Sequence, residues 1–311
     1  MPEHKKAKPK AQKVPKDDTH TTPLIPANLD ANMFGNLLSM TGYFSIVGVH
    51  TTLWVFVAFY LPRTAVLSDL AAPKWGEAQI SSRDRPQHPF LEPLTRNPTA
   101  TLFYICAGAI VLQSWWGGWM REWWLQLGIQ GTEEEKRTEK ATYDRQKMTI
   151  TRNAWIATFA ASLLIHAILV LFGAPITSLM DRTYLLALLI SVMSIYSPAY
   201  TIGVPLLGSN SASVVRKWTW VRLFTELSPR NGVERALVYP AIGTVLGCWV
   251  GVIPIALDWD RPWQAWPLTP AFGAIAGYII TSLAALSVNG VIYMANEHAR
   301  AQLDATEHKT K

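Results

Sequence analysis

The sequence predicts an all-α, polytopic membrane protein with about six transmembrane helices and both termini in the cytoplasm. The first observation is the distribution of charge. Only 16% of the 311 residues are Asp, Glu, Lys or Arg, and six long stretches contain none of them. A bilayer core about 30 Å thick is crossed by roughly 20 mostly apolar helical residues, so each stretch is long enough to span it and an ordinary water-soluble globule is excluded. The stretches are residues 31–62, 97–120, 153–180, 183–215, 236–257 and 262–296.

The second observation is the distribution of Lys and Arg on the two sides of the six spans. One side receives 21 of the 28 basic residues, because it holds both ends of the chain and the segments 121–152 and 216–235. The other side has basic residues only in 63–96 and at Arg182 and Arg261. Cytoplasmic loops are the ones enriched in Lys and Arg, so both termini are expected in the cytoplasm.

The third observation is the placement of tryptophan. Many of the 14 Trp residues lie near predicted span ends, as expected of aromatic belts at the membrane interface. The largest group, which we expect to be interfacial anchors at the cytoplasmic end of span two, is Trp115, Trp116, Trp119, Trp123 and Trp124.

The polar segments divide the chain into a membrane domain and two tails. The first tail is rich in Lys and Pro, a composition that buries too little apolar surface to fold, and no cleavable signal peptide is recognised in it. The first span is therefore expected to be its own targeting anchor. The predicted parts are a disordered basic cytoplasmic tail at 1–32, a six-span membrane domain at 33–296 and a cytoplasmic tail at 297–311; the domain includes a non-cytoplasmic loop at 63–96, a charged cytoplasmic linker at 121–152, a cytoplasmic loop at 216–235 and a non-cytoplasmic turn at 258–263.

Composition and motifs exclude several classes of function. The net charge of +6 does not indicate nucleic acid, because most basic residues flank spans, where anionic headgroups attract them. The only two cysteines, Cys106 and Cys248, lie in charge-free stretches and are expected to be small buried residues. The chain contains no H-E-x-x-H, nucleophile elbow, Walker loop or dense cluster of acids and His. We therefore expect no catalytic residue, no metal and no cofactor.

Glycines recur at helical spacing in the last two spans. Gly243, Gly247 and Gly251 form a double G-x-x-x-G on one face of span five, and span six contains Gly273 and Gly277. Helices in lipid associate through close backbone approach, which small residues at i and i+4 permit. The five glycines are therefore predicted to pack helices, either within this hairpin or against a helix of a partner.

The turn between these spans combines acidic, basic and aromatic residues, which are Asp258, Trp259, Asp260, Arg261, Pro262 and Trp263. In a structural interpretation, the aspartates cap the next helix, Arg261 pairs with one of them, and Pro262 occupies the first helical turn. In a recognition interpretation, Arg261 contacts a lipid phosphate or an acidic partner, and the tryptophans bracket a sugar or headgroup. A third alternative is a divalent metal held by the two aspartates, as in many glycosyltransferases, although no nucleotide-binding α/β domain accompanies them.

Uncharged polar side chains lie within the spans, where an unsatisfied polar group is costly. Hydrogen bonds between helices are the preferred explanation, and a proton path or a catalytic base is the alternative. These residues are His50, Gln113, His166 and Asn289, each isolated, and Ser191, Ser194 and Ser197 along one stretch.

The last two spans and their turn resemble the PIG-F family. The segments that carry the resemblance are E-R-A-L-V-Y-P at 234–240, the glycines of span five, D-W-D-R-P-W-Q at 258–264 and the segment 273–278. The sequence L-F-G-A-P at 171–175 is also similar. These specific motifs cover about 60 residues, and the six-span layout extends the resemblance over most of the chain.

The resemblance implies a subunit of the GPI-anchor pathway in the endoplasmic reticulum membrane. Members of that family bind and stabilise the large phosphoethanolamine transferases that act on mannoses of the GPI precursor, and the metal-dependent chemistry belongs to the partner. The turn 258–263 is then lumenal and is expected to contact the partner, a membrane lipid or the GPI precursor. Two alternatives stay open: a lipid-headgroup transferase that uses Asp258, Asp260 and Arg261 directly, and a lipid carrier whose path is lined by polar residues of spans three and four.

Overall fold

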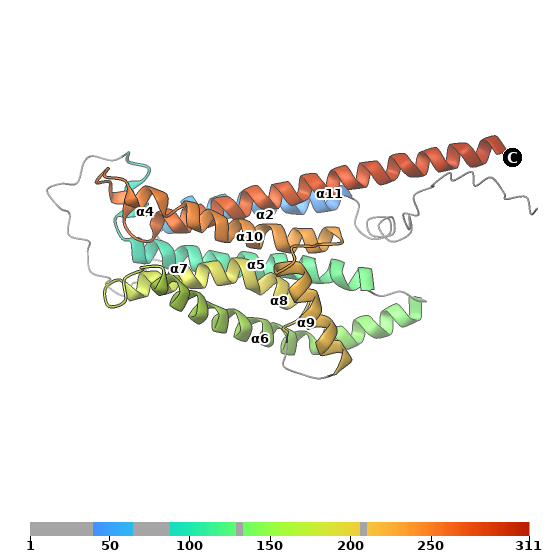
Figure 1. The fold of residues 1–311 in the computed structure, drawn as a ribbon, viewed down its shortest axis with the longest axis horizontal. Coiled ribbons are helices and arrows are strands. Elements are labelled where there is room, and N and C mark those ends of the chain that lie inside the picture. Colours follow the sequence, from blue (N-terminus) through green and yellow to red (C-terminus); the bar gives the residue numbers. More distant parts are fainter. Residues whose placement is uncertain (1–39, 65–87, 129–132, 206–209, 311) are drawn as a thin grey trace, which may run out of the picture.

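The computed structural model describes residues 40–64, 88–128, 133–205 and 210–310, which form a bundle of long helices (Figure 1). Six helical segments are long and apolar enough to cross a membrane, and each overlaps one of the charge-free stretches. Since the described residues contain no β-strand, the predicted all-α, six-span fold is confirmed. The segments are Met40–Arg63, Pro98–Leu127, Arg145–Leu171, Met180–Thr201, Gly232–Ala256 and Leu268–Gln302.

Several helices are longer than the spans they contain. The elements in chain order are α2 (Met40–Phe59), η1 (Leu61–Arg63), α4 (Glu92–Thr95), α5 (Pro98–Gly128), α6 (Glu133–Leu171), α7 (Met180–Ser191), η2 (Val192–Tyr196), α8 (Ser197–Thr201), α9 (Ser211–Phe224), α10 (Gly232–Val250), η3 (Ile253–Ala256), η4 (Pro262–Gln264) and α11 (Leu268–Thr310). The charged linker 121–152 is mostly helical, because α5 and α6 run into it from both sides. The predicted tail 1–32 and most of the loop 63–96 lie outside the described residues.

The two ends of the bundle differ in what they carry. The start of α2 and the end of α11 lie at the same end (Figure 1), as an even number of crossings requires. We call this the tail end, and we call the opposite end, which carries residues 258–263, the turn end. The count of Lys and Arg predicts a cytoplasmic tail end, and this orientation stays a prediction.

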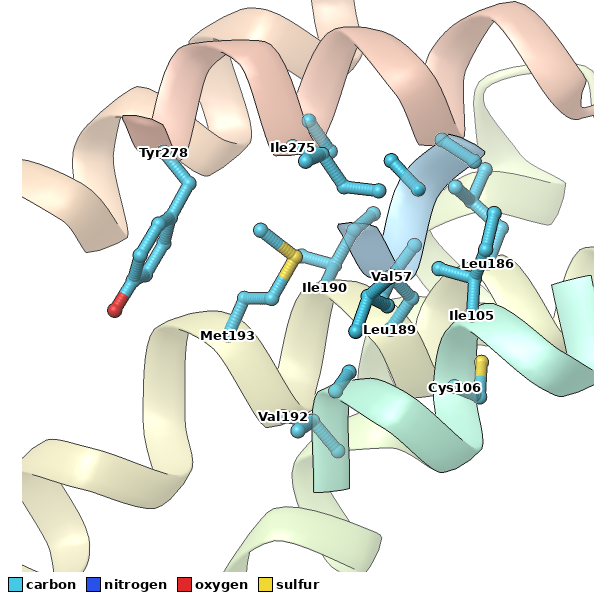
Figure 2. Packing of buried hydrophobic residues seen from close by; sticks show 14 of the residues in the cluster. Val57, Ile105, Cys106, Leu186, Leu189, Ile190, Val192, Met193, Ile275 and Tyr278 are labelled. Atoms are coloured by element: carbon cyan, nitrogen blue, oxygen red, sulfur yellow. The ribbon is translucent and has the colours of Figure 1, made fainter. Parts of the chain in front are cut away.

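The core is centred on the fourth span, which α7, η2 and α8 form together. In the most apolar part of the fourth span, 83% of the residues are buried, whereas only 17% are buried in the corresponding part of the span in α6. The fourth span is therefore the central helix and α6 is the outermost. Figure 2 shows Leu186, Leu189 and Ile190 of α7 packed with Val57 of α2 and Ile105 of α5. The remaining spans are therefore arranged around a helix that has almost no lipid-facing surface.

Candidate functional site

The five glycines predicted to pack helices lie in one seam between α10 and α11. A Cβ atom built on Gly247 would fall on the backbone carbonyl of Gly273, and one built on Gly277 would fall on the carbonyl of Gly243. Gly251 is equally close to the backbone of α11. The two helices therefore touch backbone to backbone, which only residues without a side chain permit. Because the hairpin uses its glycine faces internally, they are covered from a partner in this arrangement.

The tail end of the hairpin is fixed by a charged group around Glu234. The Glu234 side chain is 3% exposed, and its carboxylate oxygens accept hydrogen bonds from the Arg222 guanidinium at 2.6 and 2.9 Å. The backbone N–H of Arg230 donates to the same carboxylate at 2.6 Å. The hydrogen bonds with Glu234 raise the pKa of the Arg222 guanidinium, which stays charged. The charged pair thus ties α9 to the first turn of α10.

A second polar group joins α10, α11 and α2. Arg235 Nε donates to Asn289 Oδ1 at 2.6 Å, and Asn289 Nδ2 donates to the Gly232 carbonyl at 3.1 Å and to the Tyr43 hydroxyl at 3.4 Å. Asn289 is 1% exposed. The interhelical hydrogen bonding predicted for this residue is therefore confirmed.

The turn between α10 and α11 is held by Gln264. Its Nε2 donates to the carbonyls of Pro254 and Leu257, both at 2.7 Å, and its Oε1 accepts from the backbone N–H of Arg261 at 2.7 Å. Pro262 is the first residue of η4, a three-residue 3-10 helix, and not of α11 as we expected, because α11 begins at Leu268. One amide side chain thus joins both sides of the turn and fixes its conformation.

The tip of this turn is exposed. Asp258, Trp259 and Asp260 are exposed, whereas Arg261 and Trp263 are half-buried. The rings of Trp259 and Trp263 meet edge to face with centroids 5.7 Å apart, and Asp260 has a φ of 47°, a left-handed conformation that Asp tolerates better than most residues. Within the described chain, neither aspartate side chain forms a hydrogen bond or an ion pair, so the capping role that we expected of them belongs to Gln264 instead.

Two contacts at the turn end escape prediction from the sequence. Trp266 Nε1 donates to the Thr183 hydroxyl at 3.0 Å, which links the segment just before α11 to α7. The Thr99 hydroxyl accepts from Arg182 Nε at 2.9 Å and donates to the Asp181 carboxylate at 3.2 Å, which links α5 to α7. The partners are 82 or 83 positions apart along the chain, so no local spacing signals these contacts.

The polar residues inside the spans differ in how well they are paired. Ser197 Oγ donates to Gln113 Oε1 at 2.6 Å, an interhelical hydrogen bond of the predicted kind. His50 is fully buried, accepts from Trp54 Nε1 at 3.2 Å within its own helix, and stacks on Trp116 with ring centroids 4.5 Å apart. No group of three or more His, Cys, Asp or Glu residues is placed to hold a metal ion in the part of the chain that the structure describes.

Comparison with known proteins identifies the family. The family model described as "GPI biosynthesis protein family Pig-F" matches residues 87–286. The chain belongs to the PIG-F family. The matched region contains spans two to five, all five glycines of the seam and the whole turn 258–263, so the hairpin described above is part of the PIG-F family region.

Curated relatives of this PIG-F family chain are similar over part of their length. A Mus musculus protein named "GPI ethanolamine phosphate transferase, stabilizing subunit" is 35% identical over 137 residues, which are 43% of this chain and 56% of that protein. The Homo sapiens protein of the same name is 38% identical over 118 residues, 37% of this chain and 47% of its own length. "Glycosylphosphatidylinositol anchor biosynthesis protein 11" of Pyricularia oryzae is 38% identical over 163 residues, 50% and 56% of the two chains. The chain thus spans about half the length of these relatives, and no solved structure matches it.

Proposed function

We propose that the chain is a non-catalytic subunit that binds and stabilises a GPI ethanolamine phosphate transferase in the endoplasmic reticulum membrane. The family and the relatives named as stabilizing subunits of that transferase support the proposal. In this role the chain supports the transfer of phosphoethanolamine to a mannose of the GPI-anchor precursor. A large partner subunit carries the reacting groups.

The observation that carries the proposal is the tip of the α10–α11 hairpin. Asp258, Trp259 and Asp260 are exposed on a turn that Gln264 holds in one conformation, and neither carboxylate has an ion-pair partner among the described residues. A rigid element that presents charged and aromatic side chains outward favours recognition over internal stability. The turn lies at the end of the bundle opposite the tail end (Figure 1), and the count of basic residues predicts that the tail end is cytoplasmic, so the turn is lumenal in this proposal. The turn contacts the partner there, and contact with a lipid headgroup or the GPI precursor is the alternative.

Depletion of the chain from cells tests the proposal. Loss of the chain should lower the steady-state amount of the transferase protein, measured by quantitative immunoblotting, while its messenger RNA stays unchanged. GPI precursors that lack a phosphoethanolamine should accumulate in lipid extracts analysed by mass spectrometry. Re-expression of the chain should restore both quantities.

Reconstitution of the purified chain tests its non-catalytic nature. In liposomes that contain phosphatidylethanolamine and a GPI precursor, the chain alone should neither transfer phosphoethanolamine nor move headgroups between leaflets. Transfer by the chain alone that is lost in the variant Asp258→Asn, Asp260→Asn would make it an enzyme. Headgroup movement by the chain alone would make it a lipid carrier, and either result overturns the proposal.

A further inference from the structure

α10 has a second face, opposite the glycine seam, that the rest of the described chain leaves uncovered. We define the outer face as five residues that are each more than half exposed, namely Val245, Leu246, Trp249 and Val250 of α10 and Ile253 at the start of η3. Their spacing of i, i+1, i+4, i+5 and i+8 puts them on one side of the helical path. The glycines hold the other side against α11. Closure of the hairpin therefore fixes the direction in which the outer face points.

Trp249 lies in the middle of the outer face. Its side chain is 73% exposed, whereas Trp54 of α2 and Trp116 of α5 are almost completely buried. Trp combines a large contact area with few rotatable bonds, which is why it contributes strongly to binding at protein interfaces. A Trp among aliphatic residues on a rigid helix can contact either lipid or another helix, and the residues beyond it distinguish the two.

The outer face ends in an acidic tip. Asp258 and Asp260 come shortly after η3, are exposed, and have no ion pair with any other described residue. A carboxylate at the edge of a bilayer is stabilised when a cation meets it at the same depth. The outer face and the acidic tip together complement an apolar helix that ends in Lys or Arg.

α6 provides an internal comparison. Its outward-facing residues Ile156, Phe159, Leu163 and Leu164 are between 45% and 64% exposed, which is similar to the outer face of α10. The first charged residue after them is Asp181, which accepts a hydrogen bond within the chain. The apolar surface of α6 thus ends without a free charge, which suits contact with lipid alone. The unpaired carboxylates are what set the α10 surface apart.

We propose that the outer face of α10 and its acidic tip form the docking surface for a transmembrane helix of the partner transferase whose lumenal end carries Lys or Arg. The inference rests on the proposed function and adds the surface, the partner element and the charge that aligns the two. The apolar residues provide contact along the helix. The carboxylates set the depth of the partner helix in the membrane, because only one depth brings the opposite charges together.

Photo-crosslinking in native membranes locates the contact. The photoreactive residue p-benzoylphenylalanine replaces Leu246 or Trp249 in two variants, and Phe159 or Leu163 in two matched controls on α6. Probes on the outer face should form adducts with a transmembrane peptide of the transferase, identified by mass spectrometry, and this peptide should carry Lys or Arg at its lumenal end. Probes on α6 should label lipid only.

Charge reversal tests the acidic tip. The variant Asp258→Lys, Asp260→Lys should lower the amount of co-purified transferase by about tenfold or more, because it sets like charges against each other, and Asn at both positions should have a smaller effect. Both aspartates are exposed and unpaired within the described chain, but Asp260 has a left-handed φ of 47° that Lys tolerates less well than Asp. The single variant Asp258→Lys avoids this strain, so it should lower co-purification while the yield and elution volume of the chain stay unchanged. Replacing the basic residues of the crosslinked transferase peptide by Glu should restore association with the Lys variant.

The two proposals fail in different ways. A wild-type chain that retains no transferase overturns the proposed function and this inference with it. A wild-type chain that retains the transferase overturns this inference alone if the outer-face probes label only lipid, or if the α6 probes label the transferase instead. Charge reversal at the acidic tip that leaves the amount of co-purified transferase unchanged likewise overturns this inference alone.

Discussion

In the α10–α11 hairpin, two spans touch backbone to backbone along five glycines, whereas the fourth span is tied to its neighbours by three serine side chains. Lipid provides little hydrophobic drive between helices, so their association depends on van der Waals contact and on hydrogen bonds. Along the glycine seam the hairpin relies on the first kind of interaction, with the hydrogen bonds of Asn289 confined to its tail end, and the fourth span adds the second. The same chain therefore contains both means of holding membrane helices together.

The serines of the fourth span reach three different helices. The three hydrogen bonds run from Ser191 to the Thr158 carbonyl on α6 at 2.6 Å, from Ser194 to the Ala241 carbonyl on α10 at 3.5 Å, and from Ser197 to Gln113 on α5 at 2.6 Å. The π-helical segment η2 lies between the first and last of them. Its wider turn changes the direction of residues after it relative to those before it, which helps one helix contact three others.

The two regions should differ in how they respond to substitution. In the seam, a backbone atom lies opposite every glycine, and at Gly243 the Thr281 hydroxyl is closer still; backbone cannot move aside as a side chain can. A lost interhelical hydrogen bond in a membrane protein costs only about 0.6 kcal/mol on average. We therefore expect a single substitution in the seam to cause a large loss in the free energy of unfolding, and a single substitution in the fourth span to cause a small one.

The largest expected effect is at the centre of the seam. Gly247→Leu puts a side chain where the Gly273 carbonyl lies, so the hairpin must open, and the free energy of unfolding should fall by about 3 kcal/mol or more, the upper end for an overpacked core. Gly247→Ala should already lower it, since the first added carbon makes the clash. Denaturant titration of the purified chain in mixed micelles measures both variants.

Gly48 on α2 is the matched control. A Cβ atom at this helical glycine meets nothing within 4 Å, so Gly48→Leu should be neutral or should stabilise the helix by up to about 0.8 kcal/mol. Equal losses at Gly48 and Gly247 would contradict the comparison, because they would reflect a general effect of glycine replacement rather than the backbone contact.

Two parts of this structure follow from the sequence for simple physical reasons. Charge is so costly in hydrocarbon that the six charge-free stretches predict the six spans. The seam is predicted because Gly243, Gly247 and Gly251 repeat at the spacing of one helical face, and Gly273 and Gly277 repeat it on the next span. Both signals are local in the sequence, so they can be recognised without knowing how the helices pack against one another.

The tryptophans of α5 show where a local signal misleads. We expected the group as a whole to anchor at the membrane interface, yet Trp116 and Trp123 are buried and the Trp123 ring lies 5.3 Å from that of Tyr43. Trp115 is 38% exposed. Residues 116 and 123 are seven apart and share the inner face of the helix, so helical spacing, rather than crowding in sequence, separates core from interface.

The role of Gln264 could not be predicted, because it depends on the backbone path of the turn. Its amide reaches Pro254 and Leu257, ten and seven positions earlier, and only the folded turn brings those carbonyls together. The same reason applies to Ser194 and Ala241, which meet only after η2 and α10 have taken their relative rotation. Long-range pairing of polar groups is set by packing rather than by spacing.

The intermediate effect is expected at Ser197. Ser197→Ala leaves the buried Gln113 amide without its hydroxyl partner, which should lower the free energy of unfolding by about 1–2 kcal/mol. Adding Gln113→Leu should recover most of the loss, because both polar groups are then replaced by apolar ones. A double-mutant cycle should give a coupling of about 1 kcal/mol, and strictly additive losses would show that the two side chains act independently.

The smallest effects are expected at the two serines that donate to backbone carbonyls. The Thr158 and Ala241 carbonyls lie inside helices and keep their own helical N–H partner, so each substitution removes only a second hydrogen bond. Ser191→Ala, with an O–O distance of 2.6 Å, should cost about 0.6 kcal/mol. Ser194→Ala, at 3.5 Å, should cost about half of that or less. Equal losses for the two variants in the same titration would contradict this expectation. They would show that the length of these hydrogen bonds does not determine their contribution to stability, and that side-chain packing holds the fourth span in place.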